Sequence, residues 1–531
     1  MYRSGAIRQC INWYYLSEAR LASAGSEVNI RGMKPPIPLL ALLLFTVLVP
    51  LSAAPPSIQP LVTVVDLDVD EEQMVTLSDK SVAKVKLVGL NETRDPIRQA
   101  VRSVEVSLLV NGQAVVLPSG MYHLPQFVGK VRVDCSATSG LNSNGTPAFW
   151  GLDKAVRIRL WPTGSPLIRP GSFSYPLKQR WFATGTAFDN EPVDGGSSIL
   201  PKIYYHSGLD IGGAEALTKV IAATDGLVVS LGGKVLEGHE SKDGNSPVSE
   251  RYDVVYLLDD RGWYYRYSHL DQIDGSIKLG ARVKMGEAIG VLGKEGASGG
   301  WSHLHFEIKA RQPSGKWGTQ AGYGFLHQAY INQYHPSLLA TARPGMLLME
   351  GESTVLDGSQ SWIAKGAIVK YEWMFSDGEK AEGAKVEHRY PKPGCFQEVL
   401  KITDDSGNVD YDFVAIRVVS KKTPKQYPHN LHASYWPTFG IKPRDAVTFK
   451  VRSFLRSPTA DDSSNEVWDF GDGSEKVSVH SDGNRDQRAI NGYAVTQHRY
   501  EKPGHYVVTV SRQFSNGQTA NYHLQVRVGE D

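Results

Sequence analysis

The chain has 531 residues, of which 41% are hydrophobic and 21% are charged, so it is long enough for several globular domains. It carries 57 Lys plus Arg against 56 Asp plus Glu, a formal net charge of +1, which leaves no excess positive charge for a nucleic-acid backbone. Its 52 Gly and 29 Pro favour short strands joined by tight turns. We therefore expect a mainly β, multi-domain protein that does not bind nucleic acid.

The chain starts with a segment that is typical of exported proteins. Residues 33–54 combine Lys34, an apolar stretch and small residues ahead of two prolines, which is the pattern of a signal peptide. The apolar run is shorter than the roughly 20 residues of a spanning helix. We expect cleavage after this segment, no remaining transmembrane anchor, and a location that is secreted, periplasmic or in the cell envelope. Residues 1–32 are expected to be a mis-annotated or unstructured extension, with translation starting at Met33.

Residues 55–168 are expected to form an N-terminal β-domain whose role the sequence does not indicate. Apolar and β-branched stretches alternate with Gly, Asn and Pro turns. The expected strands are Leu61–Leu67, Val82–Val88, Val104–Val110, Phe127–Val133 and Val156–Trp161.

The cysteines exclude both a disulfide framework and a thiolate zinc site. Cys10, Cys135 and Cys395 are the three in the chain, and no CxxC motif occurs. Any metal must therefore be held by His and carboxylate side chains. Cys135 and Cys395 fall in different expected domains and are predicted to be buried free thiols.

Residues 169–336 contain His and Asp at spacings that suit a metal site. His206 and Asp210 are four residues apart, and His303 and His305 are two apart; on strands, each pair projects to one face. Two His and one Asp would leave a fourth zinc position for water, as in catalytic sites. Zinc lowers the pKa of bound water toward about 7 and so supplies a hydroxide nucleophile. Spacing alone leaves open which member of the His303 and His305 pair binds the metal.

Five motifs in this segment appear in the order of the lysostaphin-type, or LytM-like, zinc endopeptidases, which the chain resembles over about 130 residues. They are HSGLDIGG from His206, AATDGLVV from Ala222, YRYSHL from Tyr265, GARVKMGEAIG from Gly280 and GASGGWSHLHFEI from Gly296. The resemblance implies a small antiparallel β-fold with a groove, and cleavage of peptide bonds in bacterial peptidoglycan.

The same resemblance implies a role for each site residue. His206, Asp210 and His305 would be the zinc ligands. His303 would be the general base, and His269 would stabilise the oxyanion or position the water. Because ligand and base must be deprotonated, we expect activity to fail below about pH 6.

Two departures from the family border the expected groove. Trp301-Ser302 replaces the usual Gly-Pro, and the loop 232–251 is longer than the usual turn, so cleavage preference stays open. We expect the remaining histidines of the segment to be solvated: His239, His327 and His335. Four aromatic residues either line the groove or pack in strands: Tyr204, Tyr205, Trp263 and Tyr264.

The C-terminal third contains an internal repeat. The segment 373–378 matches 468–473, and 388–394 matches 498–504. A core Trp and a Tyr near a strand start are features of immunoglobulin-like sandwiches, and the motifs resemble polycystic-kidney-disease (PKD) domains, at residues 337–421 and 430–531. We expect Asp377, Asp469 and Asp472 to cap turns, and no metal role for His388 or His498.

The sequence thus predicts an exported endopeptidase with Zn²⁺ as cofactor and peptidoglycan peptides as substrate, whose PKD domains bind a cell-surface polymer or protein or act as spacers. Three alternatives remain. The domain is a non-catalytic LytM-like scaffold or activator, the chain is a PKD-led surface-binding protein, or the enzyme cuts a Gly-rich extracellular protein. Whether the N-terminal domain covers the groove as a pro-segment also stays open.

Overall fold

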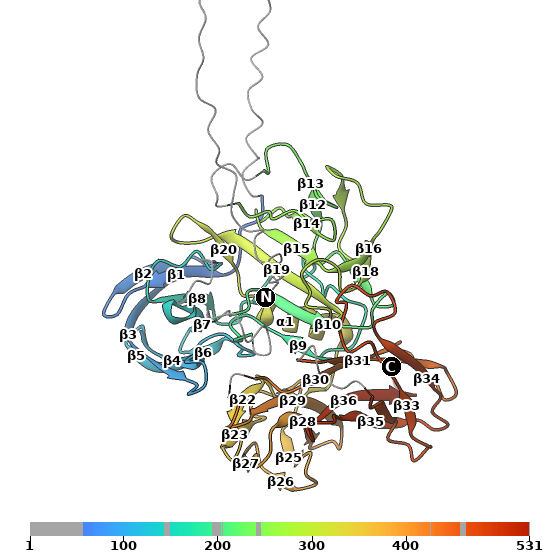
Figure 1. Cartoon of the computed structure of the whole chain (residues 1–531). Helices are drawn as coiled ribbons and strands as arrows, with labels where there is room; N and C mark the ends of the chain where they lie inside the picture. Colours follow the sequence, from blue (N-terminus) through green and yellow to red (C-terminus); the bar gives the residue numbers. More distant parts are fainter. Residues whose placement is uncertain are drawn as a thin grey trace, which may run out of the picture. The chain divides into compact units, whose positions relative to one another are not determined.

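The computed structural model describes residues 57–142, 149–193, 203, 205–240, 246–424, 426–456 and 463–529. The predicted signal peptide at 33–54, the extension at 1–32 and Tyr204 lie outside these described residues. In the described part of the chain, no helix is long and apolar enough to cross a membrane. The mainly β, multi-domain architecture is confirmed, with α1 as the one α-helix of the described residues (Figure 1).

The N-terminal part forms two four-stranded antiparallel sheets, in the orders β1-β8-β7-β6 and β2-β3-β4-β5. Alternate residues of β3 and β4 are buried, so each strand turns one face to a shared core. The strands are β1 (Thr63–Leu67), β2 (Glu72–Thr76), β3 (Val82–Arg94), β4 (Val101–Val110), β5 (Gln113–Pro118), β6 (Gln126–Val128), β7 (Val131–Thr138) and β8 (Val156–Pro162), with a 3-10 turn at Ser139–Asn142.

The single strand expected at Phe127–Val133 is wrong. It is a hairpin of β6 and β7, in which Val128 pairs with Val131. Gly129, at φ +58°, supplies the left-handed turn residue that lets the chain reverse there.

The middle part is built around the central strand β19, which pairs with β10 on one side and β15 on the other. The main sheet has the order β13-β12-β14-β15-β19-β10-β9, with β17 on β12 and β20 on β19, and a second sheet has the order β11-β18-β16. The elements are β9 (Thr186–Ala187), β10 (Leu209–Gly212), β11 (Lys219–Ile221), β12 (Gly226–Leu231), β13 (Lys234–Val235), β14 (Val255–Leu258), β15 (Tyr264–Ser268), β16 (Leu270–Ile273), β17 (Arg282–Val283), β18 (Ala288–Leu292), β19 (His303–Arg311), β20 (Trp317–Thr319) and α1 (Tyr323–Tyr334).

Several side chains that the sequence left ambiguous are buried: Trp263 and Tyr264 in the middle part, and Tyr205 in the core of the N-terminal sheets. Tyr205, Trp263 and Tyr264 are 1%, 6% and 8% exposed, so they pack in the interior and do not line a groove. The expectation of a solvated His327 is wrong. This side chain is 5% exposed on the packed face of α1, where its ring contacts that of Trp181.

The C-terminal part contains two β-sandwich modules, which we call the first module (residues 337–421) and the second module (residues 430–531). The repeated Trp373 and Trp468 are both fully buried, as the repeat predicts. The elements are β21 (Leu338–Leu339), β22 (Met346–Met349), β23 (Ser353–Asp357), β24 (Trp362–Ile363), β25 (Ile368–Met374), β26 (Lys380–Glu382), β27 (Lys385–Arg389), β28 (Gly394–Asp404), β29 (Val409–Val419), β30 (Asn430–Trp436), β31 (Val447–Phe454), β32 (Glu466–Asp469), β33 (Val477–Val479), β34 (Ala494–His498), β35 (Gly504–Gln513) and β36 (Thr519–Val528).

The two modules share one sheet of order β22-β29-β28-β36-β35-β32-β33. The junction is a parallel bridge from β28 to β36, where Cys395 pairs with Ala520. Cys135 and Cys395 are buried free thiols, as predicted. The modules are therefore joined to each other through backbone pairing as well as by the chain between them.

Candidate metal centre

Three side chains meet where β10 and β19 run side by side. Asp210 of β10 is directly opposite His305 of β19, and residues opposite each other in an antiparallel pair share a face. The Nδ1 atom of His305 is 2.8 Å from Oδ1 of Asp210, and Nε2 of His206 is 3.0 Å from the same oxygen. One ligand atom from each of the three lies within 4.8 Å of the others. The structure thus brings together the three residues that the family resemblance implies as ligands.

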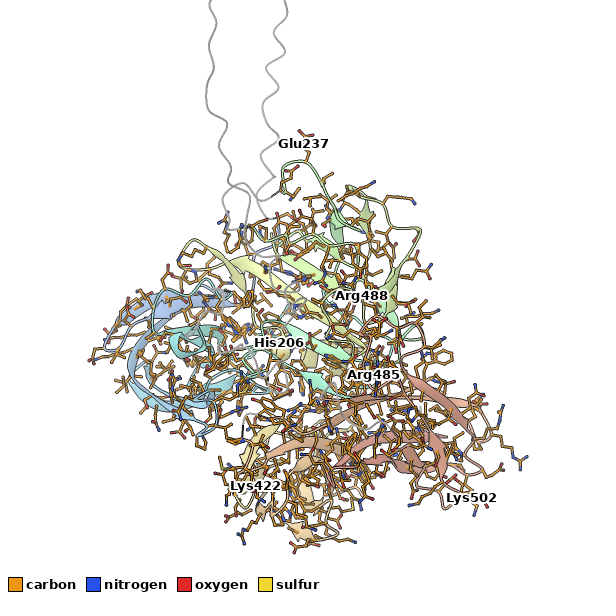
Figure 2. The ribbon with its side chains drawn as sticks, in the orientation of Figure 1. His206, Glu237, Lys422, Arg485, Arg488 and Lys502 are labelled. Atoms are coloured by element: carbon orange, nitrogen blue, oxygen red, sulfur yellow. The ribbon has the colours of Figure 1, made fainter. Side chains whose placement is uncertain are left out.

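His206 reaches this point from the loop that precedes β10 (Figure 2). Its backbone N–H donates to the carbonyl of Glu191 at 2.9 Å, and its own carbonyl accepts from the N–H of Asn190 at 2.8 Å. Gly208 follows at φ +79°, and a Cβ there would lie 2.9 Å from the carbonyl oxygen of Phe306. Only glycine fits this close passage against β19, which returns the chain to Asp210.

His303 lies beside the three ligands with a defined tautomer. Its Nε2 is 3.4 Å from Oδ1 of Asp210, and its Nδ1 is 3.1 Å from the carbonyl oxygen of Trp301. Both oxygens only accept hydrogen bonds, and the carbonyl is the nearer one, so the tautomer of neutral His303 with its proton on Nδ1 satisfies the shorter contact. The unprotonated Nε2 therefore faces the metal centre.

His269 is held on the other side of His303, with ring centroids 4.6 Å apart. Its backbone has φ +66°, and its N–H donates to Oδ2 of Asp253 at 2.9 Å. Its Nδ1 is 2.6 Å from the carbonyl oxygen of Glu295. Burial, together with the charge of His303, lowers the pKa of His269 to about 3, so the imidazole is neutral at physiological pH.

Asp253 is a functional neighbour that the sequence analysis missed. It accepts two hydrogen bonds of 2.6 Å from the guanidinium of Arg251. Burial opposes the ionised form, but the hydrogen bonds and charges of His269 and Arg251 bring its pKa well below the ordinary value. Its only sequence signal is its position beside the long loop that ends at Arg251.

The donor chemistry fits a zinc ion. Two imidazole nitrogens and one carboxylate oxygen form a catalytic zinc set with an open position. Burial raises the pKa of Asp210, but the positive charge of His206 outweighs burial and holds that pKa well below its usual range. Burial likewise opposes the charged form of His206, but the Asp210 carboxylate raises the pKa of His206 to about 9. Burial also lowers the pKa of His305 to about 4. One carboxylate and one neutral imidazole are therefore available to a cation at neutral pH.

The second module contacts the loop just before the His303 strand. The phenol oxygen of Tyr493 accepts a hydrogen bond of 2.8 Å from the N–H of Ser302, and Arg452 donates to the carbonyl of Gly300 at 2.6 Å. The ring of Trp301 stacks on His303 with centroids 3.9 Å apart, and its other neighbour is His432 at 5.3 Å. Trp301 and Ser302, which depart from the family pattern, thus connect the second module with His303.

A cavity of about 540 Å³ opens at this centre and extends between the middle part and both C-terminal modules. Its wall includes side chains from the first module, among them Phe413 and Arg417, and from the second module, among them His432 and Tyr522. The wall also contains all five residues predicted from the sequence, which are His206, Asp210, His269, His303 and His305.

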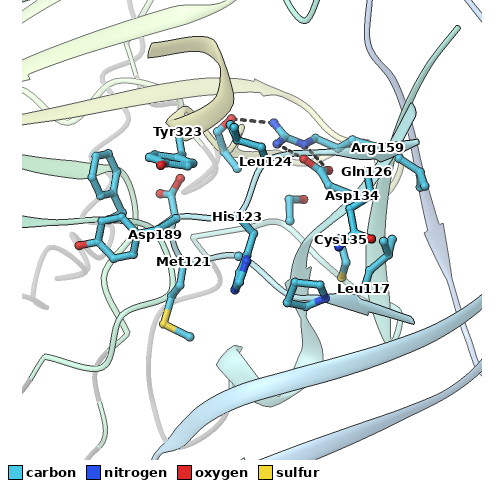
Figure 3. A pocket seen from close by; sticks show the side chains of 17 residues that line it. Leu117, Met121, His123, Leu124, Gln126, Asp134, Cys135, Arg159, Asp189 and Tyr323 are labelled. Carbon is cyan, nitrogen blue, oxygen red and sulfur yellow. Dashed lines mark hydrogen bonds and ion pairs between the residues drawn. The ribbon is translucent and has the colours of Figure 1, made fainter. Parts of the chain in front are cut away.

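A second, water-sized cavity of about 20 Å³ lies between the N-terminal part and two segments of the middle part (Figure 3). These segments are the residues just after β9 and those at the start of α1. Arg159 and Asp134 form an ion pair of 2.6 Å beside it, and Cys135 is buried in its wall. The wall also holds the buried Asp189, whose pKa burial raises to about 7. Because the space holds about one water, it is too small for a peptide substrate.

Comparison with known families supports the assignment of the middle and C-terminal parts. Residues 204–316 match the model of Peptidase family M23, and residues 339–418 match that of the PKD domain. Collagenase ColA of Clostridium perfringens is 39% identical over 71 residues, which are 13% of this chain and 6% of that protein. The chain thus spans about 6% of the length of this curated relative.

Solved structures show local similarities. The catalytic domain of the M23 protein EnpA from Enterococcus faecalis is 22% identical, over 27% of this chain and 89% of that chain, with a TM-score of 0.18. The PKD1 domain of the Vibrio cholerae metalloprotease PrtV is 29% identical, over 16% and 98% of the chains, with a TM-score of 0.14. Helicobacter pylori Csd3 is 14% identical, over 48% and 75%, with a TM-score of 0.21. Scores of this size support no conclusion about function.

Proposed function

Because residues 204–316 are a family M23 peptidase domain of the LytM type and residues 339–418 are a PKD domain, we propose that the chain is an exported zinc endopeptidase that cuts peptide bonds in bacterial peptidoglycan. The observation that carries the proposal is the convergence of His206, Asp210 and His305, with His303 and His269 beside them, in the wall of one large cavity.

His206, Asp210 and His305 would hold the metal. When bound there, zinc would supply Lewis acidity toward the scissile carbonyl and the attacking water. The chain itself contributes the carboxylate of Asp210, the neutral imidazole of His305 and the imidazole of His206, which loses its proton when it binds the metal. It also contributes the cavity and two further histidines. The carboxylate of Asp210 is shared between His206 and His305, which fixes both imidazoles before the metal arrives.

His303 is the proposed general base. Its Nδ1–H is held by the carbonyl of Trp301, so the free Nε2 can take a proton from the attacking water and later give it to the leaving amine. Stacking of Trp301 on His303 restricts the ring to this orientation. The second module therefore supports the base through the loop that it contacts.

His269 is proposed to orient the attacking water. The sequence left open whether this side chain stabilises the oxyanion or positions the water. The carbonyl oxygen of Glu295, at 2.6 Å, is nearer to its Nδ1 than Nη2 of Arg251, at 3.2 Å, so the neutral imidazole with its proton on Nδ1 presents an acceptor at Nε2. An acceptor suits a water molecule and not an oxyanion.

Export belongs to the same proposal. It is supported by the signal-peptide pattern of residues 33–54 and by the PKD domain, a module of extracellular proteins in the family resemblance. A secreted, periplasmic or envelope location would place the enzyme next to peptidoglycan. The scaffold alternative is disfavoured by the presence of all five site residues in one cavity. A purely PKD-led binding protein would not need them.

The test of the reaction is digestion of purified peptidoglycan by the chain that starts at residue 55, in the presence of zinc. We expect new amine termini and released muropeptides, identified by mass spectrometry, and no cleavage by the His303→Ala variant. Parallel digestion of gelatin tests the Gly-rich protein alternative. Cleavage of gelatin without cleavage of peptidoglycan would replace our substrate assignment.

A further inference from the structure

Two arginines of the C-terminal modules line the same cavity as the metal centre. Arg417 lies on β29 of the first module, paired with Cys395 of β28, and Arg456 follows β31 of the second module. Both guanidinium charges act on the buried Cys395 thiol, where they oppose the rise that burial causes in its pKa. Arg417 and Arg456 are thus near neighbours across the junction of the two modules.

Neither arginine forms an ion pair with any carboxylate among the described residues. Arg456 donates from Nη2 to Oδ1 of Asn430 at 2.8 Å, while its Nε is buried and has no hydrogen-bond partner. Burial and the charge of Arg417 lower the pKa of Arg456 to about 10. The charge of Arg417 also acts on the carboxyl of Glu191 in the same wall, which offsets part of it. Burying two guanidinium groups close together still costs free energy unless an anion binds there.

The other charged groups of the wall are already occupied. Arg343 is paired with Asp412 at 3.1 Å. Burial raises the pKa of the Glu191 carboxyl, and a hydrogen bond from the Tyr122 side chain together with the charges of Arg343 and Arg417 opposes this rise. Asp210 belongs to the metal centre. Arg417 and Arg456 remain as the pair that can receive an incoming anion.

We propose that Arg417 and Arg456 form a carboxylate-binding subsite of the active-site cavity, which holds a free carboxylate of the peptide substrate while the scissile bond lies at His303. Guanidinium groups suit this task because they bind carboxylates through two parallel hydrogen bonds. The inference rests on the proposed function and narrows its substrate: peptides with a free carboxylate are preferred over neutral cross-bridge peptides.

The experiment measures binding by calorimetry on the full chain carrying His303→Ala, so that peptides stay intact. The probes are a synthetic acyl tetrapeptide with a free C-terminal carboxylate and the same peptide ending in a carboxamide. We expect the carboxylate to bind at least about tenfold tighter. Arg417→Gln combined with Arg456→Gln should abolish this preference without weakening the carboxamide, which also shows that the cavity is intact. Arg444→Gln, at an exposed arginine paired with Glu501, is the matched control.

Equal affinity for the two peptides would overturn the subsite. So would a preference that persists in the double arginine variant, because another part of the cavity would then hold the carboxylate. Failure of the proposed function is a separate outcome. If the carboxylate peptide binds tightly and its binding depends on the two arginines, but the unmodified chain cuts no peptide, the subsite is supported and the peptidase assignment is wrong.

Discussion

At the scale of single residues, the site depends on which atom of each histidine carries the proton. Backbone carbonyls of Trp301 and Glu295 hold the Nδ1 atoms of His303 and His269, so both rings present Nε2 as an acceptor. Charged groups also contact both rings: Nη2 of Arg251 is 3.2 Å from Nδ1 of His269, and Oδ1 of Asp210 is 3.4 Å from Nε2 of His303. Both carbonyls belong to the loop between β18 and β19.

A buried histidine outside the site gives a prediction for acid stability. Burial, with the charge of Arg132, lowers the pKa of His327 to about 3 from an ordinary value of 6.5. The unfolded chain therefore binds this proton more readily, and stability is lost as pH falls from about 6.5 toward 3. At pH 4.5 the loss from this group is about 3 kcal/mol.

The free energy of unfolding should fall for both proteins when the pH is lowered from 7.5 to 4.5. We expect this fall to be about 3 kcal/mol smaller for His327→Phe than for the unmodified chain. Urea unfolding followed by tryptophan fluorescence measures this difference. His335→Asn is the control, because His335 is exposed at the end of the same helix. Equal acid sensitivity of His327→Phe and the unmodified chain would refute the role of burial at this position.

How much of the site could be predicted depends on how local each interaction is. The spacing of His303 and His305 along one strand placed both on one face, and the family resemblance separated ligand from base. Asp253 contacts His269 from 16 positions away in the sequence. Tyr493 contacts Ser302 from 191 positions away. The spacing of residues along a strand or helix does not predict such long-range contacts. The burial of His327 was missed for the same reason, since a helix packed by aromatic neighbours was not expected there.

At the scale of elements, the loop between β18 and β19 links the second module to the base. Tyr493→Phe removes the acceptor of the Ser302 N–H and leaves that buried group unsatisfied, which costs about 1–3 kcal/mol locally. We expect kcat to fall about tenfold or more, with KM changed less than about twofold and metal content unchanged, because a displaced base slows chemistry and not binding.

The control for this prediction is Tyr500→Phe, whose hydroxyl donates to the carbonyl of Phe470 inside the second module. It tests whether a general loosening of the module is enough to lower kcat. An unchanged kcat in Tyr493→Phe, or an equal fall in Tyr500→Phe, would show that the loop contact does not position His303.

A second group of possible ligands, Asp377, Glu379 and His388, belongs to the packing of the first module. His388 stacks on Phe375 with ring centroids 3.8 Å apart. The repeat keeps this feature in the second module, where His498 stacks on Phe470 and contacts Asp472 at 2.7 Å. Ser474 there occupies the place of Glu379, so the Asp–His contact does not depend on a third ligand.

We therefore expect Glu379→Ser to keep the metal content of the unmodified chain, as measured by inductively coupled plasma mass spectrometry after dialysis. Asp210→Asn, measured in parallel, should lose it. Metal loss in Glu379→Ser would make the first module a metal site in its own right.

At the scale of the whole molecule, residues 55–531 form one compact unit, and the large cavity has walls from the middle part, both C-terminal modules and, through Tyr122, the N-terminal part. The sequence motifs predict the peptidase domain and the PKD modules separately, and from them we expected the PKD modules to be spacers or binding arms. It could not show that they contribute to the cavity, because the arginines and tyrosines that do so follow no motif. The modules are part of the site's wall.

Metal removal should destabilise this unit. A ligand that binds only the folded chain adds about 4 kcal/mol of stability at a thousand times its dissociation constant. We expect a chelator to lower the unfolding temperature of the unmodified chain in differential scanning calorimetry and to leave that of His305→Ala unchanged. A similar shift in both proteins would mean that the chelator acts elsewhere than at the predicted ligands.

The most direct test of the account compares bound metal and peptidoglycan cleavage in the unmodified chain, His305→Ala and His303→Ala. The account predicts one zinc ion per unmodified chain, loss of both metal and cleavage in His305→Ala, and loss of cleavage with metal retained in His303→Ala. Full metal content in His305→Ala, or undiminished cleavage by His303→Ala, would contradict the division of roles at this centre.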